Sequence, residues 1–397
     1  MPTRGLAVEV KEVQALLRDQ KIEAWLIYDF RGINAIAREL FDLEGHMLTR
    51  RWFYCIPQKG DPILLAHRIE QKNFPPLPGK MWLYASMQEL EAQLAKLLKG
   101  CRRIAMEYSP RCYVPTVSYV DAGMFELVRE HVAEIVSSAN LVQYFTCRWS
   151  AEQLAGHKEA AEILHRAQQS AFVLIERELS KRKEISEYEV QQHIVKFYTD
   201  AGLTAMAEPI VAVNANASNP HYVPSASQFS MIRKNDVILI DLWAKKTVPR
   251  AVYADITWMG YAGHRAPEEV QHVFNTVVAA RDAGVEFLRE SFKRGETIQG
   301  WRVDEVVRGV ITKAGFGDKF FHRTGHSLGV EDHGNGVNID SYETRDLRDI
   351  IPGIAFSIEP GIYLTKFGVR SEVNVYFGER GPEIFTTPQQ QLTMLAV

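Results

Sequence analysis

The pattern of apolar and polar positions divides the chain into two stretches that differ in character. In the first stretch, segments with a helical period alternate with short, continuous apolar runs, which is typical of layered α/β structure. The predicted helices span 10–20 and 86–100, the predicted strands span 24–30 and 103–108, and a hairpin is predicted over 50–67. We therefore predict an α/β amino-terminal domain over residues 1–148, in which we find no cluster of catalytic side chains. His67, Glu70 and Glu107 are interpreted there as surface or structural groups.

The second stretch begins with two strong signals for helix starts. Ser150 and Gln153 form a capping box that predicts a long helix ending near Arg182. Ser186 and Glu189 form a second box, which predicts a shorter helix after the first. Two further helices are predicted over 267–292 and 298–314. Strand-like runs lie between and after these helices, so we predict an α+β carboxy-terminal domain over residues 149–397.

Composition narrows the class of protein. A chain of 397 residues is long enough for two domains, and 46% hydrophobic with 24% charged residues is ordinary for a soluble protein. The formal net charge of −3 gives no basic field for nucleic acid, and no apolar run approaches membrane-spanning length. The four cysteines are scattered without CxxC spacing, so we expect reduced thiols in a cytoplasmic protein.

Two segments of the second stretch share one plan, with an apolar strand, a polar turn and a second strand. The segment 236–259 carries Asp241 and Asp255, which are fourteen positions apart, on its two arms. The segment 353–377 carries Glu359 and Glu372, which are thirteen positions apart. Such matched hairpins indicate a duplicated domain, with a site near a pseudo-two-fold axis between its halves.

Carboxylates are rare in strand interiors and are seldom buried without a partner. A single one could lie on an exposed strand face, but four in two matched hairpins favour a common site. Close carboxylates ionise together only when positive charge offsets their repulsion, and Arg370, which is predicted to share a face with Glu372, supplies one charge. Two divalent metals would supply four. The set of two aspartates, two glutamates and an imidazole suits a dinuclear hydrolytic centre of manganese, cobalt, iron or zinc.

Three histidines, His322, His326 and His333, lie within the segment 320–336. A spacing of four could place the first two on one face of a helix, as in a helical zinc pair. Four glycines interrupt the segment, however, and each costs roughly 1 kcal/mol inside a helix. We therefore predict an extended or irregular segment. The residues alone leave open which histidine is a ligand, a catalytic group or a structural group.

Four motifs, taken together and in order, resemble those of the pita-bread metallopeptidases, and within them the Xaa-Pro dipeptidases and aminopeptidases P. The motifs are NPHYVPSAS, GHSLGVEDH, SIEPGIY and VRSEVNV, over 219–227, 325–333, 357–363 and 369–375. The resemblance covers roughly 150–390 by motif and the rest of the chain by size and α/β pattern. It implies a creatinase-like amino-terminal α/β domain and a pita-bread catalytic domain with pseudo-two-fold symmetry, in a homodimer.

The resemblance also implies a role for each candidate residue. The implied metal ligands are Asp241, Asp255, His326, Glu359 and Glu372. The implied catalytic groups are His221, His333, Glu359 and Arg370, and the implied substrate contacts are His221, His322 and Tyr253. The cofactors would be two divalent metal ions, with Mn²⁺ expected first and Co²⁺, Zn²⁺ or Fe²⁺ as alternatives. The partners would be short proline-containing peptides, without nucleic acid or membrane.

The chain departs from the family pattern near this site. Trp243 stands where Gly or Ala is usual and Trp258 where Arg is usual, so either could reshape the substrate slot. The leading hypothesis is metal-dependent hydrolysis of the Xaa-Pro amide bond. The alternatives are a metal-free, creatinase-like C–N hydrolase and a non-catalytic peptide-binding protein on the same fold. A dinuclear phosphoesterase lacks a basic cluster for phosphate.

Overall fold

The computed structural model describes residues 9–397, and the chain divides into two compact units between Cys147 and Arg148. The first unit contains one mixed six-stranded sheet, in which β1 pairs antiparallel with β2 and parallel with β5. Its strand order is β4 (Lys80–Tyr84), β3 (Ile63–His67), β2 (Trp52–Pro57), β1 (Ala24–Asp29), β5 (Arg103–Met106) and β6 (Glu134–Ser137). The predicted hairpin over 50–67 is confirmed as the antiparallel pair β2–β3.

The helices of this unit cover both faces of the sheet, because separate apolar clusters lie on its two sides. They are α1 (Val10–Asp19), α2 (Ala35–Leu40), α3 (Met87–Leu97), α4 (Ala122–Arg129) and α5 (Ala139–Thr146). The start of α3 is fixed by Ser86, whose side chain accepts a hydrogen bond from the Glu89 amide. The α/β class predicted from the pattern is therefore confirmed for this unit.

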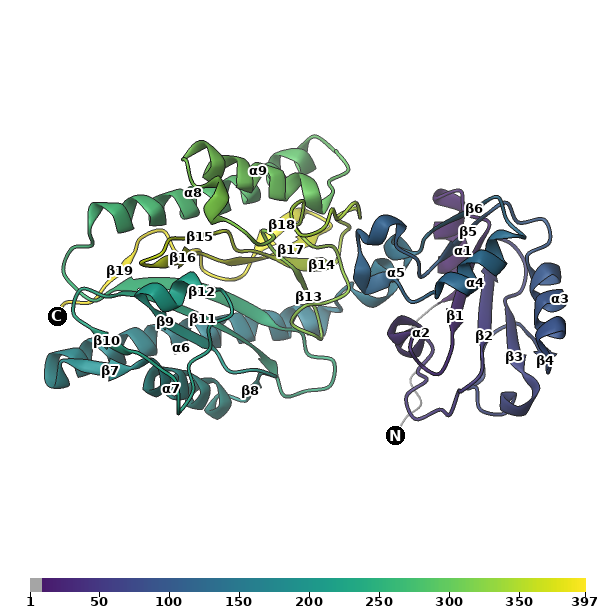
Figure 1. Cartoon of the computed structure of the whole chain (residues 1–397), viewed down its shortest axis with the longest axis horizontal. Coiled ribbons are helices and arrows are strands. Elements are labelled where there is room, and N and C mark those ends of the chain that lie inside the picture. The colour runs from purple at the N-terminus through teal and green to yellow at the C-terminus, as the bar shows by residue number, and fades with distance from the viewer. Residues whose placement is uncertain (1–8) are drawn as a thin grey trace. The chain divides into compact units, whose positions relative to one another are not determined.

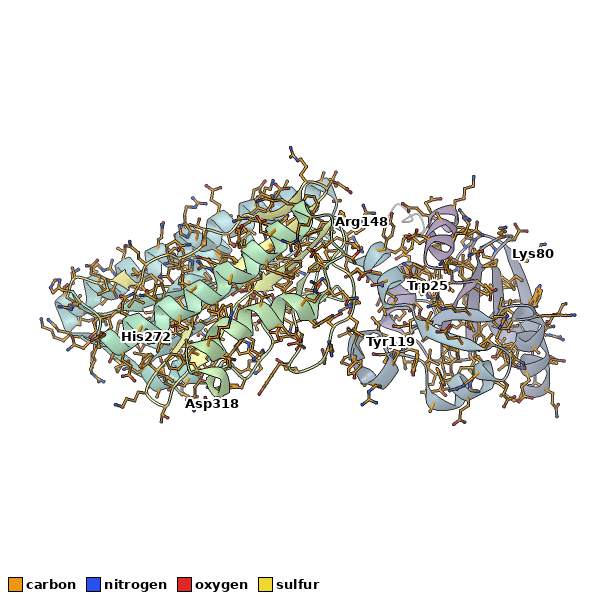
Figure 2. All side chains as sticks on the ribbon, turned by 90° about the horizontal axis from the view of Figure 1, so that it is seen from above. Trp25, Lys80, Tyr119, Arg148, His272 and Asp318 are labelled. Carbon is orange, nitrogen blue, oxygen red and sulfur yellow. The ribbon has the colours of Figure 1, made fainter. Side chains whose placement is uncertain are left out.

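The second unit follows the capping signals closely. Its four helices are α6 (Ala151–Arg182), α7 (Glu187–Asp200), α8 (Glu268–Lys293) and α9 (Gly300–Lys313). Both predicted capping boxes are present, at the starts of α6 and α7. Figure 2 shows α8 and α9 lying side by side, with His272 on α8 and Asp318 just beyond α9. None of the helices within residues 9–397 has the length and apolar character needed to cross a membrane.

Most strands of the second unit lie between the pair α6–α7 and the pair α8–α9 (Figure 1). One sheet has the order β19 (Thr393–Met394), β12 (Ala254–Tyr261), β11 (Val237–Lys246) and β8 (Leu203–Thr204), with β9 (Ile210–Val213) also paired to β11. A second has the order β13 (Ser327–Leu328), β14 (Ile354–Ile358), β17 (Val373–Gly378) and β18 (Gly381–Ile384). The two-stranded sheets are β7 (Glu184–Ser186) with β10 (Met231–Arg233), and β15 (Gly361–Tyr363) with β16 (Gly368–Arg370).

The order of elements repeats within this unit. Helices α6 and α7 precede the hairpin β11–β12, and helices α8 and α9 precede the antiparallel pair β14–β17. Each half therefore contains two helices and a pair of antiparallel strands. The simple hairpin predicted over 353–377 is wrong, because β15 and β16 lie between β14 and β17, and Glu359 and Glu372 fall just outside the paired strands. A large apolar cluster joins α6 to β11 and β12, which leaves the other face of that hairpin for polar side chains.

Candidate metal centre and active site

The second unit contains a cavity of about 1070 Å³, which is large enough for a short peptide. All the predicted site residues except Glu372 line it, and they come from both halves of the unit. These lining residues are His221, Asp241, Tyr253, Asp255, His322, His326, His333, Glu359 and Arg370. Glu372 is 1% exposed and lies behind this wall, next to Asp255.

The register of the first hairpin brings Asp241 and Asp255 to one face. Asp241 lies opposite Thr257, and Trp243 lies opposite Asp255. Because side chains alternate along a strand, residues 241, 243, 255 and 257 share the face that points away from α6. The amide of Asp255 also donates to the Asn374 side chain at 2.9 Å, which ties this hairpin to β17.

The second pair of strands places two glutamates just beyond its ladder. Ser357 pairs with Asn374 and Ile358 pairs with Val373, so Glu359 and Glu372 follow at the same end. The Ser357 hydroxyl accepts the His326 amide at 2.9 Å and donates to Glu359 Oε1 at 3.1 Å. The backbone of the histidine segment is thereby fixed to the strand that carries Glu359.

A compact cluster of ligand atoms results from these constraints. Single ligand atoms of Asp255, His326 and Glu372 all lie within 4.8 Å of one another. His326 Nε2 also lies 3.3 Å from Glu359 Oε1 and 3.6 Å from Asp255 Oδ2. Two buried oxygens of the cluster, Asp255 Oδ1 and Glu372 Oε1, have no hydrogen-bond partner in the described part of the chain. Buried carboxylate oxygens are costly to leave unpaired, so these two oxygens indicate room for a cation.

The pKa shifts of the clustered carboxylates also indicate a site for cations. Burial, together with the charge of neighbouring carboxylates, raises the pKa of Asp255 and of Glu372 well above the ordinary range. Burial also raises the pKa of Asp241, although Arg370 opposes the increase. For Glu359, burial alone would raise the pKa, but His326, His322 and Arg370 hold it below its ordinary value. This centre therefore has an excess of negative charge that divalent cations would offset.

The Arg370 guanidinium contacts protein side chains, which leaves little of it for a molecule in the cavity. Its guanidinium forms an ion pair with Asp241, donates to Tyr363 Oη at 3.1 Å, and has Nε 3.2 Å from Thr257 Oγ1. The Thr257 hydroxyl lies 3.0 Å from Asp241 Oδ1 and 3.0 Å from Glu372 Oε2. Arg370 and Glu372 thus meet at Thr257, as their predicted common face required. The arginine orients the carboxylates of both strand pairs.

The three histidines of the segment 320–336 occupy different environments. His326 is 4% exposed within the carboxylate cluster. His322 has both ring nitrogens occupied, by the Arg323 carbonyl and by Tyr363 Oη, each at 2.7 Å, and burial lowers its pKa to about 4. His333 lies with its ring centroid 4.1 Å from that of His326 and lines the cavity. The predicted irregular course of this segment is confirmed, with only the short strand β13 inside it.

The remaining predicted contacts lie along the cavity wall. His221 is exposed, and its amide donates to the Asn219 side chain at 3.1 Å. Tyr253 is fully buried by its neighbours, and its amide donates to the Gly329 carbonyl at 3.0 Å. Lys245 Nζ lies 4.7 Å from the centre of the Tyr253 ring. His221 is therefore open to a bound molecule, whereas the Tyr253 ring is covered by its protein neighbours.

The two unusual tryptophans separate onto opposite faces of the hairpin. Trp243 lines the cavity. Trp258 packs against the apolar cluster beneath α6, with its ring centroid 5.1 Å from that of His165. The hypothesis that Trp243 or Trp258 could line the substrate slot is therefore wrong for Trp258. Side chains alternate along a strand, so Trp258 points to the opposite face from its neighbour Thr257.

Several residues of the site were missed by the sequence reasoning. Tyr363 links Arg370 to His322, and its position within SIEPGIY was the only signal for it. Asp332 lines the cavity, and burial with the nearby charge of Asp255 raises its pKa to about 8. Arg323 and Glu343 also line the cavity. Neither has a sequence signal, because each reaches the site through the fold of a loop.

The donor set fits divalent metal ions. It combines carboxylate oxygens with one imidazole nitrogen, and two of its buried oxygens have no partner among residues 9–397. The Ser357 amide donates to the His326 carbonyl, and the Ser357 hydroxyl accepts the His326 amide. These bonds hold the imidazole against the carboxylates, as a metal site requires of its supporting residues.

Comparison with known proteins places the chain in a family. Residues 155–379 match metallopeptidase family M24, so the chain belongs to that family. An uncharacterized peptidase of Staphylococcus epidermidis is 26% identical over 391 residues, which cover 95% of this chain and 98% of the relative. The Xaa-Pro dipeptidase of Lactobacillus delbrueckii subsp. lactis is 27% identical over 253 residues, 62% of this chain and 61% of the relative.

The fold agrees with this assignment. A crystal structure of a dipeptidase from Mycobacterium ulcerans superposes with a TM-score of 0.67 at 19% identity, covering 98% of this chain and 97% of the other. The protein is therefore an M24 metallopeptidase with the pita-bread fold. The resemblance that the four motifs indicated is confirmed at the level of family and fold.

Proposed function

We propose that the protein hydrolyses the amide bond before proline in short peptides, using two divalent metal ions. The residues that would hold the ions are Asp241, Asp255, His326, Glu359 and Glu372. The observation that carries the proposal is the pair of buried, unpartnered oxygens of Asp255 and Glu372 where the two halves of the second unit meet. Two ions would use those oxygens and balance four carboxylates.

When bound, such ions lower the pKa of a water molecule and polarise a substrate carbonyl. The protein's own groups then manage protons and orientation. Glu359, whose pKa is held below its ordinary value despite burial, can take a proton from water and pass it to the departing nitrogen. His333 and His221 line the same cavity and can donate to the oxygen that gains negative charge. Arg370 holds Asp241 in place during this cycle.

The preference for proline rests on two supports. One is the Xaa-Pro dipeptidase activity named for the Lactobacillus relative. The other is that the cavity lining includes the apolar side chains of Met206, Ile210, Pro220, Trp243 and Phe321, which could accept a pyrrolidine ring. A ring slot distinguishes substrates by only about 1–3 kcal/mol, so selectivity for proline should be real but incomplete. The expected Mn²⁺ preference and the homodimer stay predictions.

The test is a peptide panel run with the protein supplied with Mn²⁺, Co²⁺ or Zn²⁺. We expect Xaa-Pro peptides to be cleaved faster than matched Xaa-Ala peptides, and activity to vanish after chelation. Faster cleavage of Xaa-Ala would refute the proline preference. Hydrolysis that survives complete metal removal would instead favour the metal-free, creatinase-like reaction.

A further inference from the structure

Helix α9 carries a buried ion pair outside the cavity. Asp304 is fully buried, and the side chain of Arg308, one turn further along the helix, is 16% exposed. The guanidinium places Nε 3.2 Å from Asp304 Oδ2 and Nη2 3.1 Å from Asp304 Oδ1. Neither is among the described residues that line the cavity. Burying two charges is costly, so such a pair is stable only where further hydrogen bonds satisfy it.

The two oxygens of Asp304 bind two segments that are separate in the sequence. Oδ1 accepts the amide of Thr324 at 3.0 Å and also its hydroxyl. Oδ2 accepts the amide of Ser341 at 3.1 Å and also its hydroxyl. Thr324 belongs to the histidine segment 320–336, and Ser341 lies two residues before Glu343, which lines the cavity. Asp304 therefore fixes the spacing between two loops of the cavity.

Arg308 holds the start of the histidine segment. Its Nη1 donates to the Phe320 carbonyl and its Nη2 to the His322 carbonyl, both at 2.8 Å. The guanidinium also lies 4.2 Å from the centre of the Phe320 ring and 4.4 Å from the centre of the Tyr342 ring. The ion pair as a whole thus binds the main chain of residues 320–324 at three positions.

This main chain continues directly into the metal centre. The Thr324 carbonyl accepts the amide of Glu359 at 2.7 Å. A Cβ atom at Gly325 would lie only 1.9 Å from the Ser357 carbonyl oxygen, so the segment packs against β14 without free space. The next residue, His326, accepts the Ser357 amide at 2.9 Å. A shift at Thr324 would therefore move the His326 ring relative to the Glu359 carboxylate.

We propose that Asp304 and Arg308 are positioning residues of the peptidase, which hold the His326 ring beside the Glu359 carboxylate. The inference rests on the proposed function and adds two residues that act on the reaction through the main chain. A carboxylate is required at position 304 because it accepts on both oxygens. An amide has one accepting oxygen, so it would leave the backbone amide of Thr324 or of Ser341 without a partner.

The test compares wild type with Asp304→Asn and with the control Ile311→Ala. Ile311 is a fully buried apolar residue of the same helix and is not among the described residues that line the cavity. Both variants should unfold at a lower temperature, one through an unpartnered amide and the other through a cavity. Activity is compared where circular dichroism shows every protein folded. Only Asp304→Asn should lower kcat, by roughly 10- to 100-fold with KM little changed.

Two further readouts do not depend on turnover. The visible absorption spectrum of bound Co²⁺ reports the arrangement of its ligands, and it should change in Asp304→Asn but not in Ile311→Ala. The apparent Kd for Co²⁺ should rise about 10- to 100-fold in Asp304→Asn alone. In the metal-free protein, the NMR signals of the His326 ring, assigned with His326→Gln, should shift in Asp304→Asn and stay in place in Ile311→Ala.

Two variants of Arg308 test the other member of the pair. Arg308→Gln removes the charge beside Asp304, and Arg308→Lys keeps it. A lysine lacks the planar fork that binds the Phe320 and His322 carbonyls together, so it replaces the arginine only in part. We expect both variants to lower kcat and to alter the Co²⁺ spectrum, and Arg308→Lys to recover part of the activity that Arg308→Gln loses.

An unchanged Co²⁺ spectrum in folded Asp304→Asn would overturn the inference, and so would equal changes in Asp304→Asn and Ile311→Ala. If wild type binds Co²⁺ but cleaves no peptide, the proposed function fails, and the spectrum alone decides whether Asp304 positions the ligands. If wild type binds no metal, the His326 ring signals of the three proteins decide it.

Discussion

Both units of the molecule bury carboxylates, but they satisfy them in opposite ways. In the first unit, Glu107 is fully buried and accepts hydrogen bonds from Trp25 at 2.7 Å, Ser138 at 3.0 Å and Asn34 at 3.1 Å. Asp29, which is 1% exposed, accepts hydrogen bonds from two backbone amides and the Trp52 indole. In the second unit, Asp255 and Glu372 are just as buried, yet each keeps one oxygen without a partner.

The difference shows how a structural carboxylate can be distinguished from a ligand. Donors of the fold surround Glu107 and Asp29, so these residues connect loops to strands and need nothing else. The second-unit carboxylates face other carboxylates, and burial with that repulsion raises their pKa values. Stability alone would not maintain such an arrangement, since an unpaired buried group is costly. A bound cation would account for it.

The largest expected effect comes from removing one of the unpartnered charges. Asp255→Asn should lower kcat/KM by roughly 10³-fold or more, because electrostatic stabilisation by the metals amounts to several kcal/mol. The metal content, measured by mass spectrometry after dialysis, should fall with it. The matched change in the first unit, Asp29→Asn, should keep both metal and activity. Metal loss in Asp29→Asn, or full metal content and activity in Asp255→Asn, would contradict the comparison.

His333→Ala separates metal binding from catalysis within the second unit. Its ring lies beside His326 but faces the cavity, so we expect loss of a hydrogen-bond donor rather than of a ligand. Turnover should fall about 10²- to 10³-fold with the metal content unchanged. His326→Ala should instead lose metal. Should His333→Ala lose its metal while His326→Ala retains it, the two assignments would have to be exchanged.

Metal removal should destabilise the second unit and leave the first unchanged. A ligand that binds only the folded state stabilises it by about 2.7 kcal/mol at one hundred times its Kd. Differential scanning calorimetry with and without a chelator should therefore shift the transition of the second unit alone. The shift should be absent in Asp255→Asn. An equal shift of both transitions would show that the metal acts elsewhere.

The smallest effect concerns Glu107 and pH. Burial raises the pKa of Glu107 to about 6 from its ordinary 4.5, so the folded first unit keeps a proton that the unfolded chain releases. Below about pH 4.5, the protonated Glu107 makes its full contribution to the free energy of unfolding. That contribution, roughly 2 kcal/mol, is lost as the pH rises to about 6. The Glu107→Gln variant has no titrating group at this position. The difference in the free energy of unfolding between wild type and this variant should therefore shrink between about pH 4.5 and 6. Urea denaturation at several pH values measures it, and a constant deficit would refute the shift.

The sequence by itself determined the features that depend on nearby residues. The capping boxes at Ser150 and Ser186 close within three residues, so the starts of α6 and α7 were predicted to the residue. The apolar alternation predicted the hairpins over 50–67 and 236–259, and the carboxylates within apolar runs predicted a common site. These signals suffice because caps, turns and strand faces are set by local hydrogen bonding and by the period of the backbone.

Only the tertiary structure decided which groups meet. The contact between Arg370 and Asp241 spans 129 positions, and the contact between Asp255 and Asn374 spans 119. The sequence also left open that Tyr363 connects Arg370 to His322, that Trp258 faces the apolar cluster, and that Arg323 reaches the cavity. Such contacts depend on the register and packing of elements far apart in the chain, which no local pattern encodes. The unpartnered oxygens of Asp255 and Glu372 become visible only once every other donor has been placed.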